Sequence, residues 1–485
     1  MKIITTISLA TLLLSSAKSQ TNVSGGIFSD ATWTTANSPY IVTDTVVVFP
    51  GVVLTIEPGV TVKFENNQLL EIRQAQLIAN GTAADSITFT SSDLFPTPGI
   101  FAGITLNGGS MRSQFKYCNL SYSLNGIVNS TSAYGFIIKH CKITFNVDGI
   151  RGGGLGNNSV LDSCIVENNI GTGATQFDTI KYCSISKNYR GVMDGFNIMN
   201  CVIDLNTEKG IYENTGSILN CLIRNNGTGI HKGNPLIIDN CIIKYNQTGI
   251  ETSSNQSITN CVIDSNSIGI DNGSFIDAGH NYIALCEIKY DSIGILDYGS
   301  NGHGSNTFTN NIISSNSIGI LLAVDVDSFY CNSICNNSLF GLKYDLPSNT
   351  NCVAGNYWCT ADSASTQTVV YDAHDDVTLG IVNFMPLDSA CSPLVPSVKE
   401  TSQKNVLYIF PNPASDYLTI ELTTTISKAD INIFNLLGEL MTYIHSANLK
   451  SNLDISNLSN GVYILEVIDG KNISRQKFIK QPNTR

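Results

Sequence analysis

The 485-residue sequence is poor in charged side chains and lacks clusters of basic ones. Charged residues make up 14 % of the chain, 27 Lys and Arg stand against 39 Asp and Glu, and the formal net charge is -12. Because nucleic-acid phosphates are bound by clustered Lys and Arg, this composition argues against a nucleic-acid partner. No later run reaches the roughly 18 apolar residues of a membrane span, so we expect no transmembrane segment.

The N-terminus has the pattern of an export signal. The opening letters MKIITTISLATLLLSSAKSQ contain one cation at Lys2, an apolar run to Leu14 and small residues at Ala17 and Ser19. This order is typical of a secretory signal peptide, which we place at residues 1–19. A buried first helix is the alternative, but no amphipathic period is visible.

Cysteine recurs at a nearly constant interval through the middle of the chain. The intervals of 18 to 25 residues lie in the range typical of repeat architectures. The repeated cysteines are Cys118, Cys141, Cys164, Cys183, Cys201, Cys221, Cys241, Cys261 and Cys286. Each has an aliphatic or aromatic residue three positions before it and an aliphatic residue two positions after it, as in Ile218, Cys221 and Ile223. An even offset keeps two side chains on one face of a strand, whereas an odd offset requires a corner between them.

Two corners and a glycine complete each repeat. We place the first corner at the residue before Cys, which is Asn in four consecutive repeats, because Asn tolerates a left-handed backbone. We place the second corner five residues after Cys, at Asn146, Asn169, Asn188, Asn206, Asn226, Asn246, Asn266 and Asp291. A glycine then opens the next strand, as at Gly229 and Gly249, where a positive φ or close packing excludes other residues. Short strands with polar corners predict an all-β fold, a right-handed parallel β-helix.

The repeated cysteines then form an inward column, in which free thiols pack as small apolar groups. A disulfide network is the alternative, but equivalent thiols in one column offer no preferred pairing. Five further cysteines lie outside the column. Among these we expect a disulfide between Cys359 and Cys391 across the end of the helix.

Both ends of the repeat region resemble known β-helical proteins. The letters LTIEPGVTVKF, from residue 54, resemble the opening coils of bacterial right-handed β-helix surface proteins. Residues 355–387, GNYWCTADSASTQTVVYDAHDDVTLGIVNFMPL, are similar to the closing cap of the same group, although Cys359 stands where a Gly is usual. We therefore expect a β-helix with both caps over residues 20–391. The Pro- and Ser-containing residues 392–405 read as a linker.

The last 80 residues, 406–485, lose the repeat and contain alternating strand patterns that favour a small Ig-like β-sandwich. The segment resembles the type A C-terminal sorting domain of the type IX secretion system. The motif residues that match are Pro411, Asn412, Pro413, Asp416, Gly438, Gly461 and Tyr463. The resemblance implies recognition by the type IX secretion machinery and release to, or attachment at, the outer surface of a Gram-negative cell. A fibronectin-like module without a sorting role is the alternative.

Catalytic and metal-binding patterns are sparse. Gly302-His303-Gly304 is similar to a polygalacturonase motif, but the two carboxylates that hydrolysis requires do not precede it in the expected order. Asp325 and Asp327 have the spacing of one strand face and are candidates for a calcium site or for catalysis. A lyase would also need a Lys or Arg base aligned with them, for which the sequence shows only candidates such as Lys289 and Lys343. We expect no other cofactor.

The outward positions of the repeat vary from coil to coil. Strand alternation places the residue after Cys outside, which gives an exposed apolar stripe of Val202, Leu222, Ile242 and Val262. The residue three positions after Cys forms a ladder of mixed charge, which includes Asp204, Arg224, Lys244 and Asp264. The stripe is a candidate binding face, although single exposed aliphatic residues are common.

Two functions fit these patterns. The first is a secreted, surface-displayed β-helix that acts as a non-catalytic adhesin or glycan-binding rod on an extracellular glycan or host surface. The second is a secreted polysaccharide lyase or glycoside hydrolase that acts on an acidic polysaccharide. The missing catalytic constellation favours the first.

Overall fold

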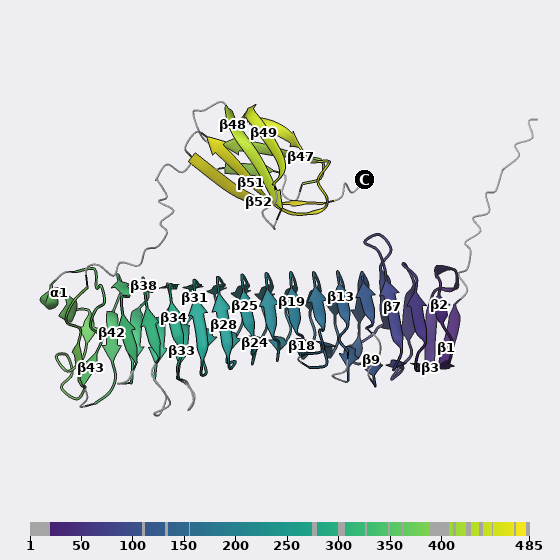
Figure 1. Cartoon of the computed structure of the whole chain (residues 1–485), viewed down its shortest axis with the longest axis horizontal. Coiled ribbons are helices and arrows are strands. Elements are labelled where there is room, and N and C mark those ends of the chain that lie inside the picture. The colour runs from purple at the N-terminus through teal and green to yellow at the C-terminus, as the bar shows by residue number, and fades with distance from the viewer. Residues whose placement is uncertain are drawn as a thin grey trace, which may run out of the picture. The chain divides into compact units, whose positions relative to one another are not determined.

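A computed structural model describes most of the chain in two compact units, Met1–Val395 and Pro396–Arg485 (Figure 1). The residues described are 20–108, 112–130, 134–154, 156–273, 279–298, 306–324, 327–347, 350–360, 362–388, 407–410, 414–422, 428–435, 440–448, 450–469 and 472–481. The expected signal peptide, residues 1–19, and the expected linker, residues 392–405, lie outside them. Within these ranges, no helix has the length and apolar character needed to cross a bilayer.

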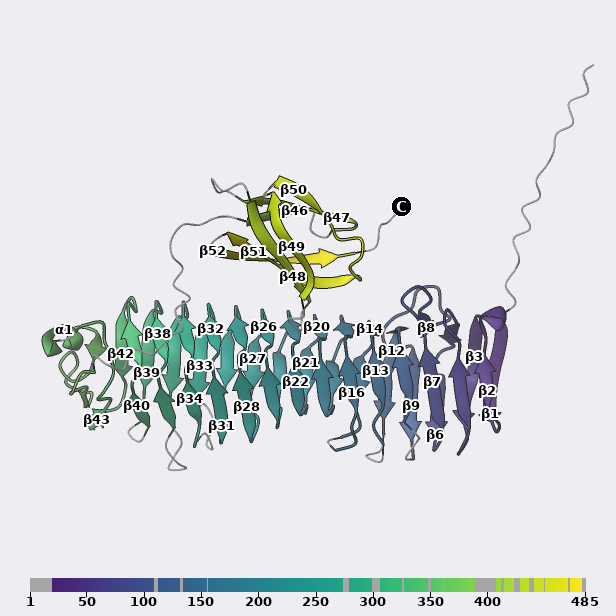
Figure 2. The same cartoon turned by 45° about the horizontal axis from the view of Figure 1, so that its top comes forward.

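The first unit is a parallel β-helix, as the repeat predicted (Figures 1 and 2). Each regular coil contributes three short strands, and every strand pairs in parallel with the equivalent strand of the next coil. The strands therefore stack into three faces, which we call the cysteine face, the glycine face and the third face. The first two faces belong to one 29-stranded sheet, and the third face belongs to a 14-stranded sheet.

The regular strands follow these three faces in turn. The cysteine face consists of β11 (Cys118–Ser121), β14 (Lys142–Thr144), β17 (Ile165–Glu167), β20 (Ser184–Ser186), β23 (Val202–Asp204), β26 (Leu222–Arg224), β29 (Ile242–Lys244), β32 (Val262–Asp264), β35 (Glu287–Lys289), β38 (Ile312–Ser314) and β41 (Ser333–Cys335). The glycine face consists of β12 (Ser123–Asn129), β15 (Asp148–Arg151), β18 (Thr172–Thr175), β21 (Arg190–Met193), β24 (Lys209–Tyr212), β27 (Thr228–His231), β30 (Thr248–Glu251), β33 (Ile268–Asn272), β36 (Ile293–Asp297), β39 (Ile318–Leu322) and β42 (Phe340–Tyr344). The third face consists of β10 (Gln114–Lys116), β13 (Ile137–Lys139), β16 (Val160–Asp162), β19 (Thr179–Lys181), β22 (Asn197–Met199), β25 (Ser217–Leu219), β28 (Leu236–Asp239), β31 (Gln256–Thr259), β34 (Tyr282–Ala284), β37 (Thr307–Thr309) and β40 (Ser328–Tyr330).

Less regular elements flank these coils. The N-terminal coils contain β1 (Thr21–Ile27), β2 (Ala31–Trp33), the 3-10 helix η1 (Thr35–Asn37), β3 (Tyr40–Val48), β4 (Val53–Ile56), β5 (Thr61–Phe64), β6 (Leu69–Arg73), β7 (Gln76–Asn80), β8 (Ile87–Ser91) and β9 (Phe101–Asn107). The C-terminal end contains β43 (Thr350–Cys352), the short helix α1 (Ser363–Gln367), β44 (Val370–Tyr371) and β45 (Ile381–Asn383).

The bore of the helix is filled by one apolar side chain from each strand. In a representative coil, Ile203, Ile211 and Ile218 come from the three faces, and all are fully buried. The column cysteines also point inward and are free thiols, as expected. Burial raises the pKa of thiols such as Cys164 and Cys183, so they remain neutral and pack as apolar groups.

The first corner lies where it was predicted, but the second corner lies one residue earlier than expected. Asn200, Asn220, Asn240 and Asn260 have φ of 51–55°. At the second corner the positive φ belongs to the fourth residue after Cys, such as Asn225 or Tyr245, and not to the fifth. This position carries Phe, Leu, Lys, Ser and Tyr as well as Asn, so the fold of the coil imposes the left-handed backbone on it.

The asparagine after each second corner has a different role, which is to link the coils from inside. The Asn226 Oδ1 accepts hydrogen bonds from the backbone N–H and the Nδ2 of Asn206, and the Asn226 Nδ2 donates to the Asn246 Oδ1. The same pattern continues through Asn146, Asn169, Asn188, Asn206, Asn226, Asn246, Asn266, Asp291, Asn316 and Asn337. We call this set the asparagine ladder. It satisfies backbone groups that the corner would otherwise leave buried without partners.

The glycines of the glycine face are required by close packing and not by a positive φ. A Cβ on Gly229 would lie 2.6 Å from the carbonyl oxygen of Gly249, and a Cβ on Gly249 would lie 2.5 Å from that of Gly269. Real Cβ atoms essentially never approach oxygen so closely, so any side chain here would push neighbouring coils apart. Of the two reasons that the sequence offered for these glycines, close packing is therefore the correct one.

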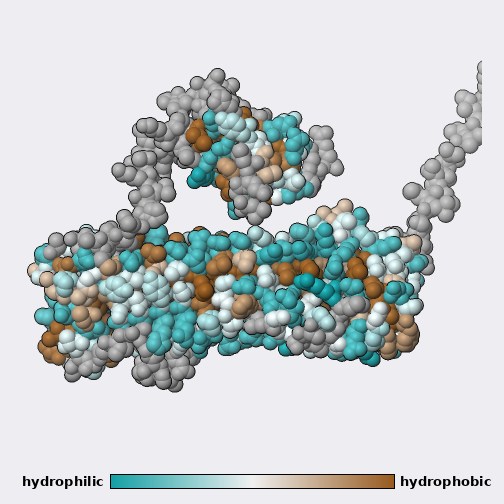
Figure 3. Space-filling model, viewed as in Figure 1, coloured by the Kyte–Doolittle hydropathy of each residue, from teal (hydrophilic) through white to brown (hydrophobic). Residues whose placement is uncertain are grey.

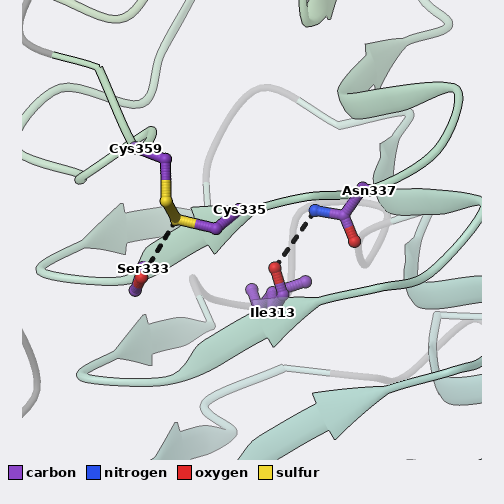
Figure 4. The surroundings of a disulfide bond; sticks show 5 residues. All are labelled: Ile313, Ser333, Cys335, Asn337 and Cys359. Carbon is purple, nitrogen blue, oxygen red and sulfur yellow. Dashed lines mark hydrogen bonds between the residues drawn. A yellow bond between two sulfur atoms is a disulfide. The ribbon is translucent and has the colours of Figure 1, made fainter.

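The expected disulfide between Cys359 and Cys391 is wrong. Cys359 is bonded to Cys335, with a Cα–Cα distance of 5.5 Å (Figure 4). Cys335 occupies the outward position of β41, where it also lies 3.3 Å from the Ser333 Oγ. The pairing thus ties the last cysteine-face strand to the following turn, which the spacing of the cysteines along the chain does not reveal.

The second unit is an antiparallel sandwich, as the alternating strands predicted. Its three-stranded sheet consists of β46 (Leu407–Phe410), β47 (Tyr417–Leu422) and β50 (Lys450–Asp454). Its four-stranded sheet consists of β49 (Leu440–Asn448), β48 (Lys428–Asn435), β51 (Gly461–Asp469) and β52 (Asn472–Lys480). Side chains of both sheets, including Leu418, Ile433, Leu465 and Phe478, share one buried core.

Candidate functional site

The glycine face carries two outward columns, because on each regular strand the residue before the glycine and the residue three positions after that one point away from the bore. Arg190 pairs in register with Lys209, and Met193 pairs with Tyr212. The first column runs through Asp148, Thr172, Arg190, Lys209, Thr228 and Thr248, and the second through Arg151, Thr175, Met193, Tyr212, His231 and Glu251. Polar and charged side chains therefore cover the face from β15 to β30.

Two adjoining hollows lie on this face and at the corner that follows its strands, over consecutive coils. The larger has a volume of about 370 Å³ and is lined by residues of β12, β15, β18 and β21, including Asp148, Arg151 and Thr175. The smaller has a volume of about 250 Å³ and is lined by Gly154, Gln176, Asp194, Glu213 and Thr215. Gln176 lines both, so the two hollows form one depression along the helix axis, which we call the glycine-face groove.

The polar groups of the larger hollow are held in place by hydrogen bonds. The Arg151 Nε donates to the Gln176 Oε1 at 2.9 Å, while the Arg151 side chain remains exposed. The Asp148 Oδ1 accepts the backbone N–H of Thr172 at 3.0 Å. A guanidinium and a carboxylate that hydrogen bonds orient thus line one hollow together with threonine side chains, and such groups are able to bind a polar ligand.

Two carboxylates from adjacent coils face the smaller hollow. Asp194 and Glu213 both have a positive φ, and the backbone N–H of Asp194 donates to the carbonyl of Tyr212, the residue before Glu213. Burial raises the pKa of Asp194, and the neighbouring Glu213 raises it further, while Gln176 and Arg151 act in the opposite direction. The electrostatic environment of this hollow is therefore negative.

A network of charged and aromatic side chains continues the face beyond the groove. Arg190 forms an ion pair with Glu208, and its guanidinium lies 4.6 Å from the centre of the Tyr212 ring. The other neighbour of Tyr212 is His231, whose ring stacks at 4.9 Å. Such cation–π and stacking contacts hold the Tyr212 ring in place on the surface.

Glu251 contacts a residue of each of the two outward columns of the glycine face. The Glu251 Oε2 lies 3.5 Å from the Lys209 Nζ and 3.4 Å from the His231 Nε2, and all three side chains are at most 18 % exposed. Burial, followed by the positive charges of Lys209 and Lys232, lowers the pKa of His231 to about 4, so this imidazole is neutral at pH 7. Burial also raises the pKa of Glu251, against the effect of Lys209. The Lys209–Glu251 contact is therefore the charged pair of this cluster.

Of the catalytic and calcium candidates from the sequence, Asp327 is the one that the described residues include. His303 and Asp325 lie outside the described residues. Asp327 precedes β40 and is 5 % exposed, and its two carboxylate oxygens accept the backbone N–H and the Nδ2 of Asn306. Both carboxylate oxygens of Asp327 are thus engaged with a buried polar residue inside the β-helix. Among the residues that the structure describes, no group of three or more His, Cys, Asp and Glu has the geometry of a metal site.

The two candidate lyase bases lie on different faces and are already paired. The Lys289 Nζ lies 2.6 Å from Glu287 on the cysteine face, and the Lys343 Nζ lies 3.7 Å from Asp345 after β42. Neither residue lines the glycine-face groove.

The apolar stripe predicted for the cysteine face forms a continuous row. Val202, Leu222, Ile242 and Val262 pair in register on four neighbouring strands. Val202 is 36 % and Ile242 45 % exposed, and the other two are partly exposed. The visible side of the surface is a mixture of hydrophilic areas and smaller apolar patches (Figure 3). The row is narrow, because the parallel ladder beside it is charged, with Arg224 bonded to Asp204.

The described sorting-motif residues have structural contacts in the C-terminal unit. Asp416 lies 3.7 Å from the buried Lys480 Nζ, and the Tyr463 hydroxyl donates to the carbonyl oxygen of Ser459 at 2.7 Å. Gly461 begins β51. Pro411, Asn412, Pro413 and Gly438 lie outside the described residues.

The comparisons with known proteins agree with this division of the chain. Residues 408–481 match the family model of the secretion system C-terminal sorting domain. No curated protein matches the chain. The sorting domain is thus the part of the chain with a recognised family.

Several solved β-helical structures are similar to the chain at low identity. Pectate lyase Pel9A has 14 % identity over 58 % of this chain and 71 % of that chain, with a TM-score of 0.30. A mutant tailspike protein of E. coli bacteriophage HK620 in complex with pentasaccharide has 11 % identity over 90 % and 86 %, with a TM-score of 0.25. The tailspike protein gp49 of Acinetobacter baumannii bacteriophage Fri1, a capsular polysaccharide depolymerase, has 11 % identity over 88 % and 73 %, with a TM-score of 0.24. Likeness at these scores carries no argument about chemistry.

The repeated coil and its parallel sheets define the first unit, and the matched tail defines the second. It is a secreted parallel β-helix protein whose C-terminal unit is a type IX secretion sorting domain.

Proposed function

We propose that the protein is a glycan-binding rod that acts as an adhesin at the outer surface of a Gram-negative bacterium. The observation that carries this proposal is the glycine-face groove, in which two hollows that share Gln176 follow consecutive coils. Stacked strands lie about 4.8 Å apart, so the groove presents outward side chains at regular intervals, although their identities differ from coil to coil. A row of mostly polar side chains at a constant spacing suits a linear polymer with repeating hydroxyl groups.

The lining chemistry supports a glycan over a peptide or lipid. Carboxylate, amide, hydroxyl and guanidinium groups are present together at Asp148, Gln176, Thr175 and Arg151. These groups match the paired donors and acceptors of sugar hydroxyls. The exposed side of Met193 is the apolar contact for a sugar ring.

Binding without turnover is the first reading, and cleavage of the bound chain is the second. The observation that favours the second is the pair Asp194 and Glu213, because hydrolysis of a glycosidic bond uses two carboxylates. Binding requires neither a cofactor nor calcium in this proposal. The same experiment therefore measures binding and cleavage, with calcium and with EDTA.

The experiment uses the mature chain, residues 20–485, and a panel of immobilised bacterial and plant polysaccharides. We expect at least one polysaccharide to bind, and we expect Thr175→Tyr, which fills the larger hollow, to weaken binding by about tenfold or more. Thr179→Tyr on the third face is the matched control. Thr179 is a terminal residue of a short strand, as Thr175 is, but it lies outside the groove. Absence of binding, or equal binding by both variants, would contradict the proposal. New reducing ends would establish the second reading.

The cell-surface part of the proposal has its own measurement. Removal of residues 406–485 should retain the protein in the periplasm, as judged by antibody labelling of intact cells. Surface labelling of the shortened protein would refute a sorting role for the tail.

A further inference from the structure

The charged groups that face the glycine-face groove are mostly negative. Asp148, Asp194 and Glu213 line it, whereas Arg151 is the cation among the lining residues described. Arg190 lies on β21, the strand of the lining residue Met193, but does not line the groove itself and is paired with Glu208. The whole chain is acidic as well, with a formal net charge of -12. An approaching polyanion therefore meets a repulsive field both at long range and inside the groove.

Arg151, the one cation among the lining residues that the structure describes, is poorly suited to anchor a row of acidic sugars. The Arg151 guanidinium donates through Nε to Gln176, and its positive charge acts to lower the pKa of Asp194, against burial and the charge of Glu213, which raise it. A sugar carboxylate bound at Arg151 would therefore compete with Asp194 for the same cation. In a polymer of uronic acids, the next sugar carboxylate along the groove would face Glu213 or Asp148 and would have no cation as a partner. Removing such an unpaired charge from water costs free energy.

We propose that the groove takes an uncharged polysaccharide chain and excludes chains of uronic acids. This inference rests on the proposed function and names the class of its ligand. Carboxylates accept hydrogen bonds from neutral hydroxyl groups, so Asp148 and Glu213 contribute to binding of a neutral chain and oppose binding of an acidic one. Thr172, Thr175 and the Gln176 amide supply further partners. The same residues thus provide affinity for one class and discrimination against the other.

The test compares each polysaccharide with a partner that differs in charge on the same backbone. Each acidic polysaccharide of the panel is paired with its carboxyl-reduced form, and each neutral one with its carboxymethylated form. Binding to the mature chain is measured at low and at high salt. We expect the neutral member of any bound pair to bind at least about tenfold more tightly at low salt, with a smaller ratio at high salt because screening weakens the repulsion.

The variant Asp194→Asn/Glu213→Gln removes two of the three lining carboxylates. We expect it to reduce the ratio between the neutral and acidic members by at least about threefold. The matched control, Asp264→Asn/Glu287→Gln, makes the same change of net charge on neighbouring strands of the cysteine face, and we expect it to leave the ratio unchanged.

The outcomes separate this inference from the function on which it rests. Equal or tighter binding of the acidic member, or an equal effect of both double variants, would overturn the exclusion of uronic acids and leave glycan binding intact. Failure of every pair to bind would overturn the proposed function itself. Circular dichroism of each variant establishes that the β-helix is retained.

Discussion

The interior and the exterior of the β-helix follow opposite rules. Inside, the same residue type recurs in coil after coil, as Cys201, Cys221 and Cys241 or as Asn206, Asn226 and Asn246. Outside, neighbouring positions change freely, so that Arg190 is followed by Lys209 and then by Thr228. The repeated positions specify the coil, because each must fit the identical position above and below it. The variable positions are the ones on which a ligand can act.

The largest expected effect comes from breaking an interior position. Asn226→Ala removes hydrogen bonds to Ile203, Arg224 and Asn246. It also removes the acceptor of the Asn206 N–H and one of the two acceptors of the Asn206 Nδ2, which keeps its bond to the Ile185 carbonyl. We expect a loss of at least about 3 kcal/mol in the free energy of unfolding, because buried groups lose partners. Urea unfolding followed by circular dichroism measures it. The exposed Asn119→Ala on β11 is the control, and a similar loss there would contradict a special role for the ladder.

A smaller effect, dependent on pH, is expected at the one acidic position of the asparagine ladder. Burial raises the pKa of Asp291 to about 8, and its buried Oδ2 has no hydrogen-bond partner among the residues that the structure describes. The folded state thus keeps a proton that the unfolded chain releases near its usual pKa of 3.8. The folded protein therefore loses stability as the pH rises from about 4 to about 8, and the full penalty is present above that range.

Asp291→Asn tests this by restoring a donor at the Oδ2 position. We expect the free energy of unfolding of the variant to exceed that of the natural chain by on the order of 2 kcal/mol at pH 9 and to differ little from it at pH 4. Thermal unfolding across this range measures the difference. A constant difference between the two proteins at all pH values would show that Asp291 does not titrate in the folded state.

The smallest effect is expected on the outer stripe. Ile242→Thr changes a half-exposed residue that has a buried neighbour of the same type, Ile243. Both Ile and Thr suit a strand, so we expect a change within about 0.5 kcal/mol at position 242. Ile243→Thr is the matched comparison and should cost about 2 kcal/mol or more, because it buries a hydroxyl. Equal costs would mean that the stripe is covered, and the distinction between inside and outside would fail there.

The sequence predicted the interior of the β-helix correctly wherever a single property of a residue determines its position. The period of two along each strand placed Cys221 and Ile223 inside, and the preference of Asn for a left-handed backbone located the corner at Asn220. The asparagine ladder was misread because Asn has two properties, a tolerance of positive φ and an amide that bonds in both directions. One sequence cannot tell which of them Asn226 uses.

The groove and the disulfide were missed for a different reason. Asp194, Glu213 and Gln176 lie at variable positions, and their proximity arises only when successive coils are stacked. A signal was present, because these residues recur at the coil interval, but nothing in their identity separates them from other polar corner residues. The pairing of Cys335 with Cys359 likewise depends on the path of the last turn.

The regular spacing of the asparagine ladder and of the glycines also affects how the β-helix can gain or lose coils during evolution. Residues 221–240 form one complete coil, and their removal would join Asn220 to Cys241, so that every column would continue from one unit to the next. Because each coil contacts only its neighbours, duplication or loss of twenty residues changes the length of the rod and leaves its cross-section intact. Unequal recombination within the repeat can therefore set how far the outer surface extends without redesigning the protein.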